Sequence, residues 1–126
     1  MSKMSPTQRA LAECKRRGWI AQVVEHTVPR TFIKRDLFGV IDIVAIANHS
    51  WIVGIQVTSG ANHSARVAKI AAEPRAWSWH SAGGRLVVWS FALRGARGKR
   101  KRYELREQWI GIAEFDAAAS QKRSAA

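Results

Sequence analysis

Three polar side chains interrupt two otherwise apolar segments in the middle of the chain. Asp42 stands in GVIDIVAI, residues 39–46, and Gln56 and Thr58 stand in WIVGIQVT, residues 51–58. A buried carboxylate is costly unless it is paired, hydrogen-bonded or bound to a metal ion. The two segments are therefore where we expect the chemistry of this protein.

The spacing of the two segments brings these side chains together. Both are rich in β-branched residues, and only Asn48, His49 and Ser50 separate them, so they are predicted to form a β-hairpin. With the turn at those three residues, Asp42 is level with Gln56, and both lie at one edge of the sheet.

This edge has the ligands of a divalent metal site. Glu25, in the segment before the hairpin, offers a second carboxylate. The carboxylates of Asp42 and Glu25, the amide oxygen of Gln56 and the carbonyl of Val57 would form an all-oxygen site suited to Mg²⁺ or Mn²⁺. Such a metal can align a water molecule and stabilise the charge that develops on a phosphodiester. Asp36, in the basic KRD segment, is interpreted as a salt-bridge or turn residue, although it is close enough in sequence to join the site.

The elements that position the site follow from capping and periodicity. Ser5 and Pro6 begin a helix that ends at Gly18, and residues 19–28 read as a strand ended by Pro29. After the hairpin, the pattern predicts a helix from about residue 62, a break at Pro74 and a second helical segment over 75–82. A strand over 85–93, a basic mobile loop or hairpin tip over 94–102 and a last strand or strand–helix junction follow. The order α-β-β-β-α-β predicts an α/β fold with a mixed sheet flanked by helices. Residues 1–116 would form one domain, and 117–126 a flexible tail.

The charge points to a polyanionic partner. The chain has 126 residues, with 21 Lys and Arg against 9 Asp and Glu, a formal charge of +12. Nucleic acid is the commonest partner of such a chain. Phosphate contacts that carry no sequence preference are expected from Lys34, Arg35, Arg66, Arg97, Lys99, Arg100, Lys101 and Arg102. We expect no membrane span and, from the single cysteine, a cytoplasmic protein.

The order of these motifs resembles the PD-(D/E)XK nuclease superfamily, in particular the archaeal- and phage-type Holliday junction resolvases and their small phage relatives. In that pattern an acidic residue enters the second strand, here Asp42 in GVIDIVAI, and a (D/E)-X-K tripeptide follows on the third strand, here Gln56-Val57-Thr58. The flanking RDLFGVID and QVTSGANHSARVAKI also look like a phage-encoded branch. The resemblance covers residues 5–92. It implies a restriction-endonuclease-like core, a Mg²⁺ or Mn²⁺ cofactor, DNA as substrate, a possible homodimer and the cytoplasm of a bacterium or a phage-infected cell.

The chain departs from the family pattern at two positions. The second acid is Gln56, and the lysine is Thr58, which has no cationic group. Some members relocate this lysine to the following helix, where Lys69 is the preferred replacement, with Lys34 in reserve. Gln8 best matches the glutamate of the resolvases' first helix, and Glu13 lies further along, so Glu25 is the preferred second acid.

The sequence is compatible with two functions. The first is a metal-dependent DNA endonuclease acting on branched DNA, with Asp42, Gln56, Thr58, Lys69 and Glu25 in its active site. The second is a catalytically inactive nuclease fold kept as a DNA-binding module. A basic adaptor that binds an acidic protein ranks last, because no motif supports it.

Overall fold

The structure, a computed structural model, describes residues 4–125 of the chain, and side chains over 4–123. Its elements in chain order are α1 (Pro6–Arg17), β1 (Ile20–Val23), β2 (His26–Thr27), β3 (Lys34–Arg35), β4 (Ile43–Ala47), β5 (Trp51–Ser59), the 3₁₀ turn η1 (Gly60–Asn62), α2 (His63–Ala71), α3 (Pro74–Ser81), β6 (Arg85–Arg94), β7 (Arg102–Ile110) and α4 (Ile112–Ala125).

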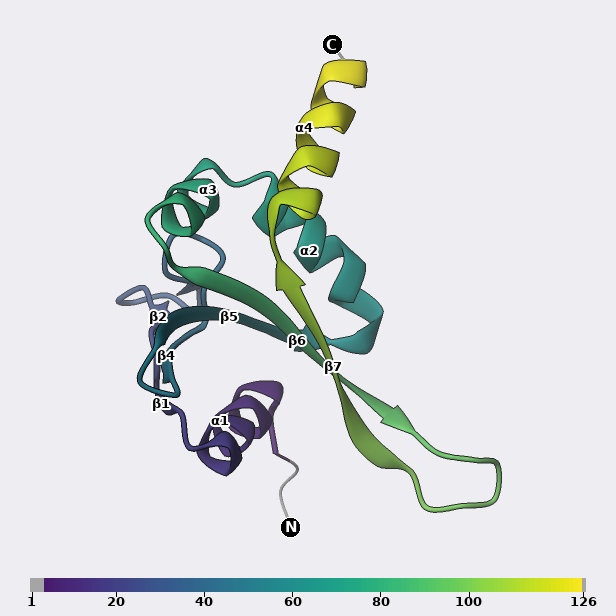
Figure 1. The fold of residues 1–126 in the computed structure, drawn as a ribbon. Coiled ribbons are helices and arrows are strands. Elements are labelled where there is room, and N and C mark those ends of the chain that lie inside the picture. The colour runs from purple at the N-terminus through teal and green to yellow at the C-terminus, as the bar shows by residue number, and fades with distance from the viewer. Residues whose placement is uncertain (1–3, 126) are drawn as a thin grey trace.

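A five-stranded sheet forms the centre of the molecule, with the order β1-β4-β5-β6-β7. The pair β5 and β6 is parallel, and the other neighbours are antiparallel. Helix α1 lies on one face of the sheet, and α2, α3 and α4 lie on the other (Figure 1). The predicted α/β fold with a mixed sheet flanked by helices is therefore confirmed, and the predicted α-β-β-β-α-β order corresponds to α1, β1, β4, β5, α2 and β6.

Each face of the sheet has its own hydrophobic core. Beneath α1, Ala10 and Cys14 pack in one cluster with Trp19, Ile55 and Trp89. On the opposite face, the helices α2, α3 and α4 contribute Ile70, Ala76 and Phe115 to a second cluster, together with Ile41, Leu86, Val88 and Ile110. Alternate residues of β5 point to opposite faces, so Val53, Ile55 and Val57 join the first core and Gln56 faces the second.

The β4–β5 hairpin has the predicted turn, and this turn sets the register that matters for the site. Asn48 and His49 have φ of 53° and 60°, as a type I′ turn requires, and the Ser50 N–H donates to the Ala47 carbonyl at 3.0 Å. The paired residues then include Ile46 with Ile52 and Ile43 with Ile55. Asp42, one residue before β4, is consequently brought to the level of Gln56.

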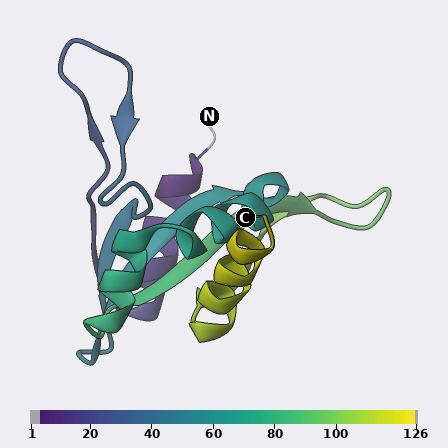
Figure 2. The same ribbon diagram turned by 90° about the horizontal axis from the view of Figure 1, so that it is seen from above.

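The predicted strand over residues 19–28 is divided. β1 ends at Val23, and the chain then leaves the sheet to form a two-stranded ribbon of β2 and β3, in which His26 pairs with Arg35. The division occurs because Val24 and Glu25 donate their N–H groups to the carbonyl of Asp42, at 2.9 and 3.4 Å, and Asp42 lies just before the first residue of β4. Figure 2 shows the ribbon projecting from the body of the molecule, as the β6–β7 hairpin does elsewhere.

The end of the described chain is helical, where the sequence predicted a flexible tail from residue 117. Helix α4 spans Ile112–Ala125. Its first turn is fixed by the Glu114 carboxylate, which accepts from the Gly111 N–H at 2.7 Å. Phe115 then buries its ring against the edge of Trp77, with centroids 5.2 Å apart. The following alanines have the highest intrinsic helix propensity, so the helix continues.

His63 at the start of α2 is buried. Its Nδ1 lies 2.7 Å from the Ser90 hydroxyl, and its Nε2 lies 2.9 Å from the Gln108 amide oxygen. The imidazole thereby ties the beginning of α2 to β6 and β7.

Candidate functional site

Asp42 is held at the end of the β4–β5 hairpin by both its backbone and its side chain. Its N–H donates to the Ile55 carbonyl at 2.9 Å. Its Oδ2 accepts from the Gln56 Nε2 at 2.6 Å and from the Val57 N–H at 2.8 Å. The side chain is 4% exposed. The predicted approach of Asp42 and Gln56 is confirmed.

Two further carboxylates converge on Asp42 from the base of the β2–β3 ribbon. Glu25 comes immediately before β2 and Asp36 immediately after β3. Oxygen atoms of Glu25, Asp36 and Asp42 all lie within 4.8 Å of one another, with Asp42 buried and the other two residues half-buried. We call these three residues the carboxylate cluster.

Asp36 was interpreted from the sequence as a salt-bridge or turn residue that could join the site, and the structure places it in the carboxylate cluster. It does begin a turn, since its carbonyl accepts from the Gly39 N–H at 3.0 Å. Among the residues that the structure describes, however, it forms no salt bridge, and its carboxyl group lies against Asp42. The bridge between Leu37 and Ile41 folds the chain back and places Asp36 there. The available signal was its position six residues before Asp42.

The cluster disfavours the ionised form of Asp42. Burial raises the pKa of Asp42 to about 8, and the neighbouring Asp36 carboxyl adds to the rise through a hydrogen bond and through its charge. The Val57 N–H acts in the opposite direction, and the charge of Glu25 raises the pKa slightly further. A cation bound at this point would stabilise the ionised form.

Gln56 leaves one polar atom without a partner beside the cluster. Its amide nitrogen is used by Asp42, while its Oε1 is buried and, among the described residues, accepts no hydrogen bond. Because both atoms belong to one amide group, this oxygen also lies next to Asp42. An orphaned buried oxygen is costly unless a donor or a cation meets it. The donor set, carboxylates with an amide oxygen, is of the type that Mg²⁺ and Mn²⁺ prefer.

Val57 and Thr58 complete the strand beside the cluster. The Val57 N–H faces Asp42, and because the N–H and C=O of one strand residue point to the same side, its carbonyl faces the same edge of the sheet. Thr58 is buried on the face of the sheet that also carries Gln56, and it pairs in register with Ser90 of β6. Its side chain supplies no positive charge at this place.

Of the two lysines considered for the missing cation, the structure places Lys34 at the cluster. Its Nζ lies 3.6 Å from the Glu25 Oε1, and its side chain is otherwise exposed. Lys69 lies on α2 with an exposed side chain. The pKa of Glu73 is lowered mainly by a hydrogen bond from Arg75, and the charge of Lys69 contributes to this shift. No described ion pair joins Lys69 to the cluster.

The two acid positions of the first helix lie apart from the cluster and have structural roles. The Gln8 side chain accepts from the Ser5 N–H at 2.8 Å, and the Ser5 hydroxyl accepts from the Gln8 N–H at 3.1 Å, which forms a capping box. Glu13 pairs with Arg16 and Arg17, and the Arg16 hydrogen bond is the main reason why the pKa of Glu13 is lowered.

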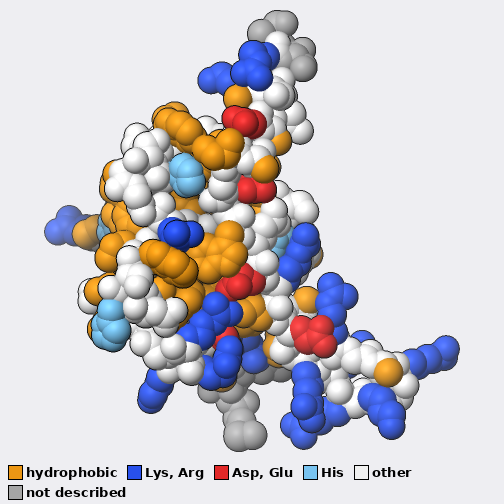
Figure 3. Space-filling model, in the orientation of Figure 1, with side chains coloured by type: hydrophobic (Ala, Val, Ile, Leu, Met, Phe, Trp, Pro, Cys, Tyr) orange, Lys and Arg blue, Asp and Glu red, His pale blue; other side chains and the backbone are white. Residues whose placement is uncertain are grey.

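The predicted phosphate-binding residues occupy three places. Lys34 and Arg35 form β3 of the ribbon, Arg66 is half-buried on α2, and the remainder lie at the tip of the β6–β7 hairpin: Arg97, Lys99, Arg100, Lys101 and Arg102. In Figure 3, Lys and Arg side chains gather over this projecting hairpin at the lower right. A hairpin tip is one of the two forms predicted for the basic segment 94–102, and the ends of this segment lie in β6 and β7.

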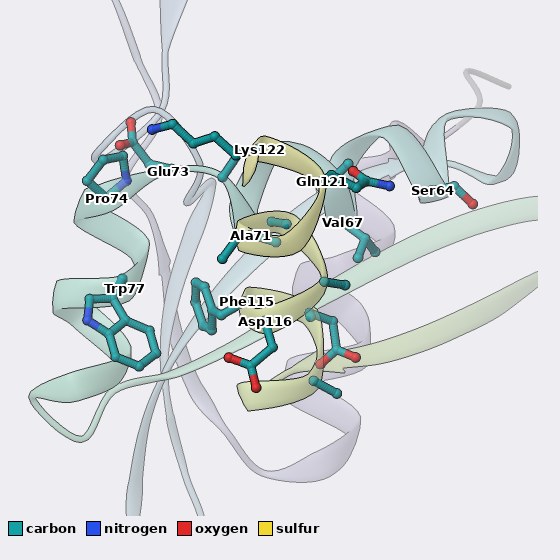
Figure 4. Close-up of a pocket in the computed structure, with 17 residues that line it drawn as sticks. Ser64, Val67, Ala71, Glu73, Pro74, Trp77, Phe115, Asp116, Gln121 and Lys122 are labelled. Carbon is teal, nitrogen blue, oxygen red and sulfur yellow. The ribbon is translucent and has the colours of Figure 1, made fainter. Parts of the chain in front are cut away.

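An apolar groove lies away from the carboxylates. It has a volume of about 980 Å³ and runs between α2, α3 and α4, where Val67, Trp77 and Phe115 are among its lining residues (Figure 4). None of the three clustered carboxylates lines it. The groove and the carboxylate cluster are therefore separate features.

Comparison with protein-family models, with curated proteins and with solved structures finds no match to this chain. Within the described part of the chain, none of the helices is both long and apolar enough to cross a membrane.

Proposed function

We propose that this protein is a divalent-metal-dependent DNA endonuclease that hydrolyses phosphodiester bonds, with branched DNA such as a Holliday junction as its expected substrate. The observation that carries the proposal is the convergence of Glu25, Asp36 and Asp42 within 4.8 Å beside the buried, unpartnered Gln56 Oε1. The order and pairing of α1, β1, β4, β5, α2 and β6 agree with the core that the resemblance to PD-(D/E)XK nucleases implies.

The residues fit a Mg²⁺ or Mn²⁺ ion. Asp42, Glu25, the Gln56 oxygen and the Val57 carbonyl are the expected ligands, and Asp36 joins them as a third carboxylate. The chemistry that such an ion supplies when bound is activation of a water molecule and stabilisation of charge on the scissile phosphate. Because Asp36 and Glu25 bring negative charge that the neutral Gln56 does not, the site retains the charge needed to hold a divalent cation.

Lys34 is the residue that we assign to the cationic role. Thr58 cannot hold a positive charge near the reacting phosphate, whereas Lys34 has a flexible, exposed side chain whose ammonium group already reaches the cluster at Glu25. Once Glu25 ligates a cation, this ammonium group is free to contact a phosphate oxygen. This reverses the order expected from the sequence, in which Lys69 was preferred and Lys34 was the reserve.

The basic surface supports DNA as the partner. The formal charge is +12, and basic residues concentrate on two projecting parts of the molecule, the β2–β3 ribbon and the β6–β7 hairpin. Contacts from these residues to phosphates would give affinity without sequence preference. Two copies of the chain would present two cleavage sites to a symmetric junction, so a homodimer is the expected assembly.

One observation favours the second candidate, an inactive nuclease fold that binds DNA. Thr58 is buried and uncharged at the position of the family's lysine. Such a module would bind DNA equally well with and without divalent metal, and Asp42→Asn would not alter its function.

The deciding experiment is a cleavage assay with Mg²⁺ or Mn²⁺ on supercoiled, linear and four-way-junction DNA. We expect metal-dependent cleavage by the wild type and its loss in Asp42→Asn. Asp116→Asn, which removes an exposed carboxylate of α4, is the matched control and should cleave normally. No cleavage of any substrate, or full activity of Asp42→Asn, would refute the nuclease proposal.

A further inference from the structure

The tip of the β2–β3 ribbon carries a phenylalanine that lies entirely in solvent. Phe32 is 102% exposed, and Ile33 beside it is 56% exposed. The other exposed aromatic residues among those described contact a second ring or a guanidinium group, namely Phe38 with Trp79, Trp51 with Arg85, Trp77 with Phe115, Tyr103 with Arg9, and Trp109 with Trp19. In the described chain Phe32 has no such contact, and this distinguishes it.

The tip is an ordered structure. Val28 to Thr31 form a turn closed by the Thr31 N–H donating to the Val28 carbonyl at 3.2 Å. The Thr31 hydroxyl donates to the same carbonyl at 2.9 Å and accepts from the Ile33 N–H at 3.1 Å. Arg30 has φ of 63°, a backbone conformation that is unfavourable for a residue other than glycine. The turn therefore holds Phe32 outward on a fixed backbone.

The ribbon connects this phenylalanine directly to the carboxylate cluster. Glu25 and Asp36 lie at its base, and Lys34 and Arg35 form one of its strands. An extended chain rises about 3.3 Å per residue, so the four residue steps from Asp36 to Phe32 span at most roughly 13 Å. Base pairs in DNA are stacked about 3.4 Å apart. Phe32 therefore lies within about four base steps of a phosphate held at the cluster.

The positive charge of the ribbon indicates which kind of partner its apolar tip contacts. Residues 26–35 include Arg30, Lys34 and Arg35 and no acidic residue. A phenylalanine surrounded by cations is complementary to DNA, whose phosphates attract the cations while its base steps accept an apolar side chain. Inserting a side chain into a continuous duplex requires unstacking of a base step, and this cost is smaller where stacking is already interrupted.

We propose that Phe32 inserts at an interrupted base step of DNA and thereby directs the carboxylate cluster to branched or otherwise distorted DNA in preference to continuous duplex. This inference rests on the proposed nuclease function and adds the structural feature by which the substrate is selected. The ribbon positions the substrate through Phe32 and Lys34, while the cluster at its base faces the phosphate to be cleaved.

Binding without cleavage tests the inference. A four-way junction with 2-aminopurine at the branch point, and a continuous duplex of the same length and label, are titrated in EDTA with the wild type, Phe32→Ala, Phe32→Trp and Ile112→Ala. Ile112 on α4 is 54% exposed and is the matched control for removal of an exposed apolar side chain. Circular dichroism confirms that each variant is folded.

We expect the wild type to increase 2-aminopurine fluorescence at the branch point and to bind the junction more tightly than the duplex. Phe32→Ala should bind the junction about ten-fold more weakly, within the range of aromatic–base stacking, and should lose the fluorescence change, with little effect on the duplex. Phe32→Trp should retain both properties, and Ile112→Ala should behave as the wild type.

The inference is overturned if Phe32→Ala binds the junction normally, if it weakens junction and duplex equally, or if neither DNA is bound. It is also overturned if Phe32→Ala leaves DNA binding unchanged and alters only the molecular mass measured by sedimentation, since Phe32 would then pack against a second copy of the chain. Cleavage by the wild type is measured separately. If the wild type cleaves DNA with metal and Phe32→Ala prefers the junction over the duplex as strongly as the wild type does, only this inference is refuted. If the protein unstacks the base at the branch point but never cleaves DNA, the nuclease proposal is refuted and the insertion of Phe32 stands.

Discussion

Asp42→Asn should stabilise the metal-free protein at neutral pH, even though it removes a residue of the proposed active site. The substitution keeps the shape of the side chain. An amide oxygen in the place of Oδ2 can still accept from the Gln56 Nε2 and the Val57 N–H. The amide nitrogen can then donate to the Asp36 carboxylate at any pH, whereas the Asp42 carboxyl can donate to it only while it is protonated.

The size of the effect follows from the pKa of Asp42. Burial, followed by the hydrogen bond and charge of Asp36, raises that pKa from 3.8 to about 8. Between these values the folded protein binds one proton more than the unfolded chain, so the free energy of unfolding falls as pH rises, by about 1.4 kcal/mol per unit. At pH 7, about three units above the lower value, the free energy of unfolding is therefore roughly 4 kcal/mol lower than it would be with a side chain that cannot ionise. The asparagine avoids this cost.

Urea unfolding in EDTA at pH 4, 5.5 and 7 measures the difference. The two proteins should be nearly equally stable at pH 4, and Asp42→Asn should gain progressively up to pH 7. Above pH 8 the difference should stop growing, because the carboxyl is then ionised in both states. Adding Mg²⁺ at a hundred times its dissociation constant should stabilise the wild type by about 2.7 kcal/mol and leave the variant unchanged. A variant that is less stable than the wild type at pH 7, or a difference independent of pH, would refute the reasoning.

Three further changes separate the parts of the site. Asp36→Asn should weaken Mn²⁺ binding and slow cleavage at least ten-fold, since it removes one of the clustered carboxylates; unchanged Mn²⁺ titration by calorimetry would remove Asp36 from the ligand set. Lys34→Ala should reduce the cleavage rate about ten-fold or more while Lys69→Ala stays near wild type, and the opposite ranking would return the cationic role to α2. Replacing Lys99, Arg100 and Lys101 together by alanine should reduce the salt slope of DNA binding by up to about 2.7, measured by fluorescence anisotropy; an unaltered slope would mean that the hairpin tip does not contact phosphate.

The parts of the site that could be predicted from sequence depend on local geometry. The apolar runs around Asp42 and Gln56, together with a three-residue connection, determine a hairpin and its register, and the structure places their side chains 2.6 Å apart. The capping of α1 between Ser5 and Gly18 could be predicted for the same reason, because caps involve residues only three or four positions apart.

The parts that could not be predicted depend on how distant segments close on one another. The β2–β3 ribbon has only two paired residues in each strand, and both strands are exposed, so no alternation of apolar residues marks it. Asp36 in a basic segment has the appearance of a surface ion-pair residue. Its contact with Asp42 exists only because Leu37 pairs with Ile41 and Glu25 is bound to the Asp42 backbone.

In the proposed nuclease, the ribbon would supply the charges that Gln56 and Thr58 lack relative to a (D/E)-X-K tripeptide. Gln56 lacks the charge of an acid and Thr58 lacks the charge of a lysine, and both charges return from the segment between Glu25 and Asp36: a carboxylate from Asp36 and an ammonium group from Lys34, 3.6 Å from Glu25. A chain with no cation to bind would gain about 4 kcal/mol at pH 7 from Asp42→Asn, because burial, followed by the neighbouring Asp36, makes ionisation of Asp42 costly. The cluster therefore makes physical sense as a site whose ionised form is completed by a divalent cation, and this is why we place the nuclease before the inactive binding module.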